Sequence, residues 1–213
     1  MTAPATARAR TPLRWRGIRR WHVLERLARE RQWRRGAELG LFRGETYLHL
    51  LARLPDLTLI GVDLWAAAES DAGDPGYRSY EGRPLAAFEA HVRAQAGQFG
   101  GRAIILKTTT RAAAERVAGA NLDFVFIDAD HTVKGVTGDI FAWAPKVGKN
   151  GWILGHDIHF PSVRRVVDDI LPAYREYPDF VWGVPKARTR FAATLPGGCC
   201  KPSRSQDFTE RRG

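Results

Sequence analysis

The segment FIDADH, residues 126–131, ends an apolar run with two carboxylates and an imidazole, Asp128, Asp130 and His131. A carboxylate beside a buried strand costs free energy unless a partner or a ligand compensates for the lost water. Carboxylates bind divalent cations, and an imidazole that titrates near neutral pH can take a proton from a hydroxyl. The segment therefore predicts either a ligand site with acid–base chemistry or a strand that simply ends at the surface.

Polar clusters interrupt the other apolar runs in the same way. In chain order, the candidate site residues are Glu38, Gly40, Phe42 and Gly44; Asp63 and Leu64; Thr109 and Thr110; Asp128 and His131; and His156 and Asp157. In open α/β sheets, ligands bind outside the carboxyl ends of the strands. We therefore expect these residues to gather along one edge of a sheet, although His156 and Asp157 could instead cap a helix near Pro161.

The elements that must position these residues alternate between apolar strands and helical patterns. Strands are expected at residues 36–42, 57–65, 102–109, 122–128, 151–157, 179–184 and 190–195, and helices at 17–32, 44–54, 84–98, 110–119, 134–144 and 161–174. This alternation predicts a Rossmann-like, doubly wound α/β fold, in which a mostly parallel sheet lies between two helical layers. Residues 185–189 are too few for a parallel crossover, so the last two strands are expected to form a C-terminal antiparallel hairpin.

The positive charge lies outside the expected sheet. Residues 1–36 contain 11 Arg and two Glu, whereas residues 37–196 contain 18 basic and 19 acidic residues. A neutral body argues against a groove that follows a nucleic-acid backbone. We expect a disordered basic arm at residues 1–16, one domain at 17–196 and a flexible tail at 197–213. The basic helix at the start of the domain could pack on the body or contact an anionic partner or membrane surface.

Composition indicates the cellular compartment expected for the protein. The sequence has no run of eighteen apolar residues, which predicts no membrane span, and its Arg-rich beginning lacks the apolar stretch of a secretory signal. Cys199 and Cys200 are adjacent and form neither a zinc pattern nor a disulfide framework. A reducing, cytoplasmic localisation is therefore expected.

The turn after the first strand indicates what the site would bind. Its pattern is E-x-G-x-x-x-G from Glu38 to Gly44, in which Gly40 lets the backbone approach a ligand. The pattern is not the G-x-G-x-x-G of dinucleotide binders, and Glu38 would repel a phosphate. Asp63, at the end of the next strand, could accept both hydroxyls of a ribose. An adenosine that carries a positive charge in place of phosphates is S-adenosylmethionine.

The segments GAELGLFRGET, GVDLW, LDFVFIDADH and GWILGHD together resemble a class I S-adenosylmethionine-dependent methyltransferase. The resemblance covers residues 37–195, and its motifs fall in the order and at the intervals of that family. FIDADH with GHD is similar to the branch that contains macrocin- and mycinamicin-type sugar O-methyltransferases and cephalosporin-hydroxylase-like proteins.

The resemblance implies roles for several residues. Asp128 corresponds to a metal-binding carboxylate, His131 to the general base of the sugar enzymes, and His156 with Asp157 to a metal-binding pair. The chain departs from the branch at His156, which replaces an oxygen ligand. A site for Mg²⁺ would then be less favoured, and manganese, iron or zinc more so. Thr109 and Thr110 replace the Asp-Ser that often faces the adenine, and Asp130 is expected to orient its loop.

The expected function is O-methylation of a small-molecule or carbohydrate hydroxyl, with a His general base and a divalent metal as aids. The alternatives are an RNA ribose methyltransferase that uses the basic arm and a non-catalytic S-adenosylmethionine-binding protein. The loop at residues 70–83 is expected to cover the acceptor, with contacts from Tyr77, Arg78 and Tyr80. The sequence leaves open the acceptor and whether the chain forms a homo-oligomer.

Overall fold

The computed structural model describes residues 17–66 and 85–193. The basic arm, the acceptor loop and the flexible tail that the sequence predicts lie outside these residues. Among the described residues, no helix combines the length and the apolar composition that a bilayer span requires.

The described residues form a seven-stranded sheet in the order β3-β2-β1-β4-β5-β7-β6. The strands are β1 (Arg35–Leu39), β2 (Thr58–Asp63), β3 (Ala103–Lys107), β4 (Leu122–Ile127), β5 (Val147–Gly155), β6 (Arg175–Glu176) and β7 (Trp182–Pro185). Strands β1 to β5 run parallel, β7 pairs antiparallel with β5, and β6 pairs antiparallel with β7. The mostly parallel, Rossmann-like sheet with an antiparallel C-terminal edge is therefore confirmed.

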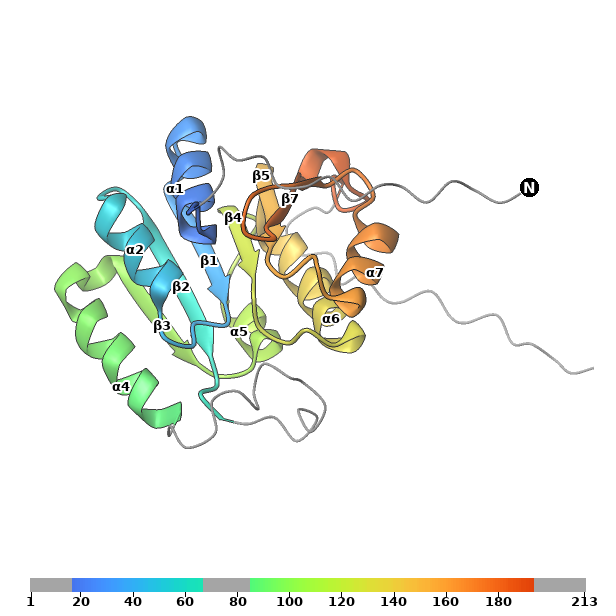
Figure 1. Cartoon of the computed structure of the whole chain (residues 1–213). Coiled ribbons are helices and arrows are strands. Elements are labelled where there is room, and N and C mark those ends of the chain that lie inside the picture. The colour runs from blue at the N-terminus through green and yellow to red at the C-terminus, as the bar shows by residue number, and fades with distance from the viewer. Residues whose placement is uncertain (1–16, 67–84, 194–213) are drawn as a thin grey trace, which may run out of the picture.

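Helices cover both faces of this sheet (Figure 1). They are α1 (Arg20–Arg31), α2 (Glu45–Arg53) and α4 (Leu85–Ala96) on one face, and α5 (Thr110–Arg116), α6 (Val133–Trp143) and α7 (Pro161–Ile170) on the other. Short 3₁₀ helices occupy residues Gly97–Arg102 (η3), Ala144–Lys146 (η4) and Lys186–Arg188 (η5). This three-layer arrangement agrees with the predicted fold class.

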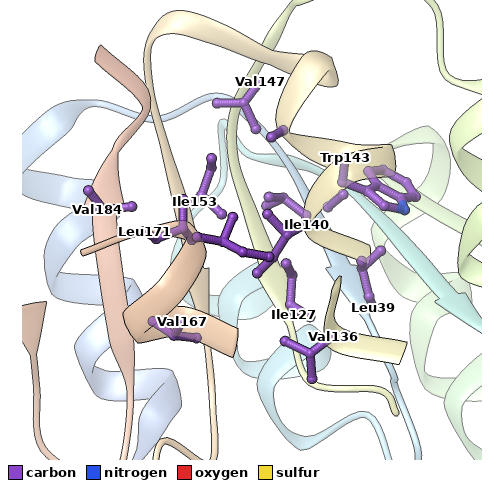
Figure 2. Packing of buried hydrophobic residues seen from close by; sticks show 14 of the residues in the cluster. Leu39, Ile127, Val136, Ile140, Trp143, Val147, Ile153, Val167, Leu171 and Val184 are labelled. Atoms are coloured by element: carbon purple, nitrogen blue, oxygen red, sulfur yellow. The ribbon is translucent and has the colours of Figure 1, made fainter. Parts of the chain in front are cut away.

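The two faces of the sheet have separate apolar cores. Figure 2 shows one of them, in which Ile140 of α6 and Val167 of α7 belong to the same cluster as Ile127 and Ile153 of the sheet. On the other face, Leu24 and Leu27 of α1 are buried, whereas the arginines of its opposite side are exposed. The basic helix therefore packs on the body through its apolar side.

The first of the two predicted closing strands, at residues 179–184, is confirmed over 182–184, whereas the second, at 190–195, is wrong because the described part of it forms no strand. Strand β7 begins only at Trp182, because Asp179 and Phe180 both have a φ of +57°, which is incompatible with an extended strand. Residues 190–193 form turns, and the hydroxyl of Thr189 accepts a hydrogen bond from the Phe191 backbone N–H at 3.1 Å. Among the described residues, the antiparallel partners of β7 are therefore β5 and β6, both of which precede it, and not a later strand.

Candidate active site

A cavity of about 520 Å³ opens at the carboxyl ends of the parallel strands. Of the residues predicted for the site, Glu38, Gly40, Phe42, Asp63, Leu64, Thr109, Thr110, Asp128, His131, His156 and Asp157 all line it. Gly44 does not line the cavity; it caps α2 with a φ of +75°. The volume is in the range of cavities that hold small organic ligands.

Gly40 allows the loop after β1 to pass close to β4. Its φ is +87°, and a Cβ at this position would overlap the backbone carbonyl of Asp128. A side chain would therefore meet both an unfavourable backbone conformation and a steric clash. The glycine therefore lets the loop after β1 lie against the backbone of Asp128 and Ala129.

Asp63 organises two strained loops at the cavity wall. Its Oδ2 accepts hydrogen bonds from the backbone N–H groups of Leu41 and Phe42, both at 2.8 Å, and its Oδ1 accepts one from Trp65 at 2.6 Å. Phe42 and Trp65 have φ values of +46° and +45°, which bulky residues rarely adopt. Strain of this kind gathers at functional sites. These three hydrogen bonds use both acceptor sites of Oδ2 and one of Oδ1, so Oδ1 keeps acceptor capacity for one ribose hydroxyl.

Glu38 is a buried acid that faces the cavity. Its side chain is 3% exposed, and its Oε2 has no hydrogen-bond partner among the described residues. Burial, reinforced by the negative charges of Asp128 and Asp63, raises the pKa of Glu38 well above its usual value, although Arg20 acts in the opposite direction. A cationic group in the cavity would supply the partner that this carboxyl lacks.

Two imidazoles and two carboxylates form a cluster at the ends of β4 and β5. His131 Nε2 lies 2.9 Å from Asp157 Oδ2 and 3.8 Å from Asp128 Oδ1. His156 Nδ1 lies 3.4 Å from Asp128 Oδ1 and 3.2 Å from Asp157 Oδ1. Asp157 reaches this position with a φ of +55°, a conformation that Asp tolerates better than most residues.

The members of the cluster shift one another's titration. Burial alone would lower the pKa of His131 and of His156, but Asp128 and Asp157 outweigh it and raise each pKa to about 10. Burial would raise the pKa of each carboxyl, yet the contacts with the two histidines lower it below its usual value. The four groups therefore form two ion pairs at neutral pH.

The cluster offers a donor set for a divalent cation. One ligand atom each from Asp128, His131 and Asp157 lies within 4.8 Å of the others. Two carboxylate oxygens with imidazole nitrogen fit manganese, iron or zinc better than magnesium, which prefers oxygen alone. His156, the predicted ligand, has its Nδ1 beside both carboxylates, so the geometry also accommodates it.

Thr109, Thr110 and Asp130 form hydrogen bonds at or near the ends of helices. Thr109 caps α5, where its hydroxyl accepts a hydrogen bond from Ala112 N at 3.1 Å. Thr110 hydrogen-bonds with the buried Asp139 of α6. Asp130 accepts a hydrogen bond from Thr132 N at 2.7 Å, which is the loop-orienting role expected of it.

Two charged residues that contact the cluster, Arg20 and Asp179, were not predicted. Arg20, the first residue of α1, lines the cavity, and its Nε lies 3.4 Å from Asp128 Oδ2. Asp179 accepts a hydrogen bond from the Arg20 backbone N–H at 2.8 Å and lies 4.0 Å from His156 Nε2. Nothing in the sequence separates Arg20 from the other arginines of residues 1–36, and Asp179 lay inside an expected strand.

Comparisons with known proteins bear on the family and the fold. A family model described as a methyltransferase domain matches residues 37–158. No curated protein sequence matches the chain significantly. Among solved structures, Rv0187 from MTB in a cofactor-bound form is similar, with a TM-score of 0.57 and 15% identity over 84% of this chain and 83% of that one. A Staphylococcus aureus protein, provisionally described as a caffeoyl-CoA O-methyltransferase, has a TM-score of 0.52 and 14% identity over 76% of this chain and 80% of that one.

Proposed function

We propose that this chain, which belongs to the methyltransferase domain family, transfers a methyl group from S-adenosylmethionine to a hydroxyl of a small molecule or sugar. One observation carries the proposal. A single cavity joins the acids and the glycine turn at the ends of β1 and β2 to the histidine–aspartate cluster at the ends of β4 and β5. The first group suits an adenosine-linked cation, and the second suits activation of a hydroxyl.

The cofactor would lie along the first group. S-adenosylmethionine supplies, when bound, a methyl group on a positively charged sulfur. Asp63 would accept a ribose hydroxyl through Oδ1, which keeps acceptor capacity beside its hydrogen bond from Trp65 N. Glu38 would face the positively charged amino-acid end of the ligand, which suits its burial and the lack of a partner for its Oε2 among the described residues. Thr109 and Thr110 line the part of the cavity at the end of β3, where the adenine would lie.

The acceptor would lie at the second group. Asp128, His156 and Asp157 would hold a divalent cation, whose contribution is to lower the pKa of an acceptor hydroxyl. His131 would take the hydroxyl proton, because its imidazole lines the cavity beside these carboxylates. It can do so only once the charges of Asp128 and Asp157 are neutralised, since these charges raise its pKa.

The decisive test of cofactor use is calorimetry with S-adenosylhomocysteine, the demethylated product. We expect wild-type protein to bind it, and substitution of the partnerless acid, Glu38→Gln, to weaken binding of S-adenosylmethionine. Wild-type protein that binds neither compound would contradict the proposed function.

Turnover tests the roles at the other end of the cavity. Release of S-adenosylhomocysteine is measured with a panel of hydroxylated acceptors, after chelation and after addition of magnesium, manganese or zinc. His131→Ala should lower turnover by about 10²- to 10⁴-fold and leave S-adenosylhomocysteine affinity nearly unchanged. His91→Ala, an exposed histidine of α4, is the matched control. Equal losses of affinity and turnover in His131→Ala would show that His131 is not the base, and full turnover after chelation would exclude the metal role.

A further inference from the structure

Arg20 reaches the cavity from a helix that lies outside the family match at residues 37–158. Its side chain is 24% exposed. The guanidinium is held from the sides: Nε donates to Thr46 Oγ1 at 3.0 Å, and Nη2 donates to Glu45 Oε2 at 3.3 Å. Among the described residues, none is hydrogen-bonded to Nη1, which leaves its two N–H groups for another acceptor.

The charge of Arg20 is unusual for its surroundings. Among the described residues that line the cavity, Arg20 is the only Lys or Arg. A guanidinium does not lose its proton in proteins. The guanidinium is therefore a permanent cation at the end of the cavity where Glu38 is buried.

Arg20 and Glu38 together match an amino-acid group. A free α-amino acid carries one ammonium and one carboxylate, so a site for it needs an acid and a cation side by side. Glu38 supplies the acid, with a buried oxygen that lacks a partner. Arg20 supplies the cation, close enough for its charge to lower the pKa of Glu38. Planar guanidinium groups bind carboxylates with particular strength, often through two hydrogen bonds.

We propose that Arg20 binds the carboxylate of the amino-acid portion of S-adenosylmethionine, so that helix α1 forms part of the cofactor site. This inference rests on the proposed function, because it assigns one end of the same cofactor. It predicts that the N-terminal helix contributes to cofactor affinity and not only to packing of the sheet face.

The test compares two ligands that differ in the amino-acid portion. S-adenosylhomocysteine carries it, whereas 5′-methylthioadenosine has the same adenosine and thioether without it. Calorimetry on Arg20→Met should show S-adenosylhomocysteine affinity lowered by about 10- to 100-fold, and 5′-methylthioadenosine affinity within about twofold of wild type. Arg20→Lys, which keeps a cation, should recover part of the loss. Arg26→Met is the matched control, because Arg26 lies on the exposed side of α1 and pairs with Glu30 at 2.6 Å.

A second comparison uses the wild-type protein and so does not depend on how the variant folds. Decarboxylated S-adenosylmethionine should bind wild type more weakly than S-adenosylmethionine, and Arg20→Met should remove this difference. Equal losses for S-adenosylhomocysteine and 5′-methylthioadenosine in Arg20→Met would make Arg20 a structural residue and overturn the inference, as would an unchanged S-adenosylhomocysteine affinity. Wild-type protein that binds none of these ligands would refute the proposed function itself.

Discussion

Asp139 is a buried acid next to the cavity wall, and its replacement tests the electrostatics of the structure. It lies on α6, is 4% exposed, and its Oδ2 has no hydrogen-bond partner among the described residues. Burial raises the pKa of Asp139 to about 7, the negative charge of Asp130 adds to the rise, and the hydrogen bond with Thr110 opposes it. The perturbation is Asp139→Asn, which keeps the shape and removes the ionisation.

The size and the sign of the effect follow from the two pKa values. The folded state binds the proton of Asp139 up to pH 7, whereas the unfolded chain releases it near pH 3.8. Between these values the folded state holds more protons, so the contribution of Asp139 to stability falls as the pH rises. The difference between the two pKa values corresponds to about 4 kcal/mol of folding free energy, at ~1.4 kcal/mol per pH unit. Of this contribution, about 2–3 kcal/mol is lost between pH 5 and pH 8.

The assay is urea unfolding of both proteins at half-unit intervals from pH 5 to pH 8.5. The stability of Asp139→Asn relative to wild type should increase with pH and level off above pH 7. Asp169→Asn is the control, because Asp169 is an exposed acid on α7. Parallel stability curves for wild type and Asp139→Asn would refute the reasoning, since they would mean that Asp139 is ionised in the folded protein at all these pH values.

Three further substitutions test individual contacts. Gly40→Ala should lower the free energy of unfolding by about 2–4 kcal/mol, because the new Cβ would meet the Asp128 carbonyl. Gly100 also has a positive φ, +57°, but no atom lies near its would-be Cβ, so Gly100→Ala should lower the free energy of unfolding by only about 1 kcal/mol. Equal losses for the two variants in chemical denaturation would exclude the clash. Asp63→Asn keeps only one acceptor oxygen for three backbone N–H groups, so we expect its free energy of unfolding to fall by about 1–3 kcal/mol and its affinity for S-adenosylhomocysteine to decrease. An unchanged melting temperature in thermal unfolding would contradict the role of Asp63 in holding the loops. Asp157→Asn should weaken manganese or zinc binding at least about 10-fold in competition with a metal indicator, and unchanged affinity would remove Asp157 from the ligand set.

The sequence predicts the parallel part of the fold well, for a physical reason. Strands β1, β2, β4 and β5 are mostly buried, and the edge strand β3 is apolar although partly exposed, so each of the five appears as an apolar run. Because these strands run parallel, the polar residues that follow them must lie at the same edge of the sheet. The C-terminal edge is different. Strand β6 has two residues, both exposed, and no apolar pattern marks it. Phe191 is buried without being in a strand, and this burial is the feature that the apolar pattern of residues 190–195 reflects.

The site is predictable only where its residues follow strands of the sheet. Asp128 and His156 could be located because the strand that positions each of them ends directly before it. Arg20 could not, because its position depends on how α1 packs across the sheet and on a hydrogen bond to Asp179, 159 residues away in the chain. Such contacts between distant segments leave no local pattern.

The left-handed backbone conformations of two residues at the cavity are a further feature that the sequence does not predict. Phe42 and Trp65 have side chains that disfavour positive φ, so their sequence positions alone predict ordinary backbone. Asp63 compensates for the strain through hydrogen bonds to both residues, and the indole N–H of Trp65 donates to the Phe42 carbonyl at 2.9 Å. The loops after β1 and β2 therefore hold one another in place around one carboxylate. The same carboxylate is proposed to bind the ribose, so the shape of the cavity wall and its affinity for the cofactor depend on a single side chain.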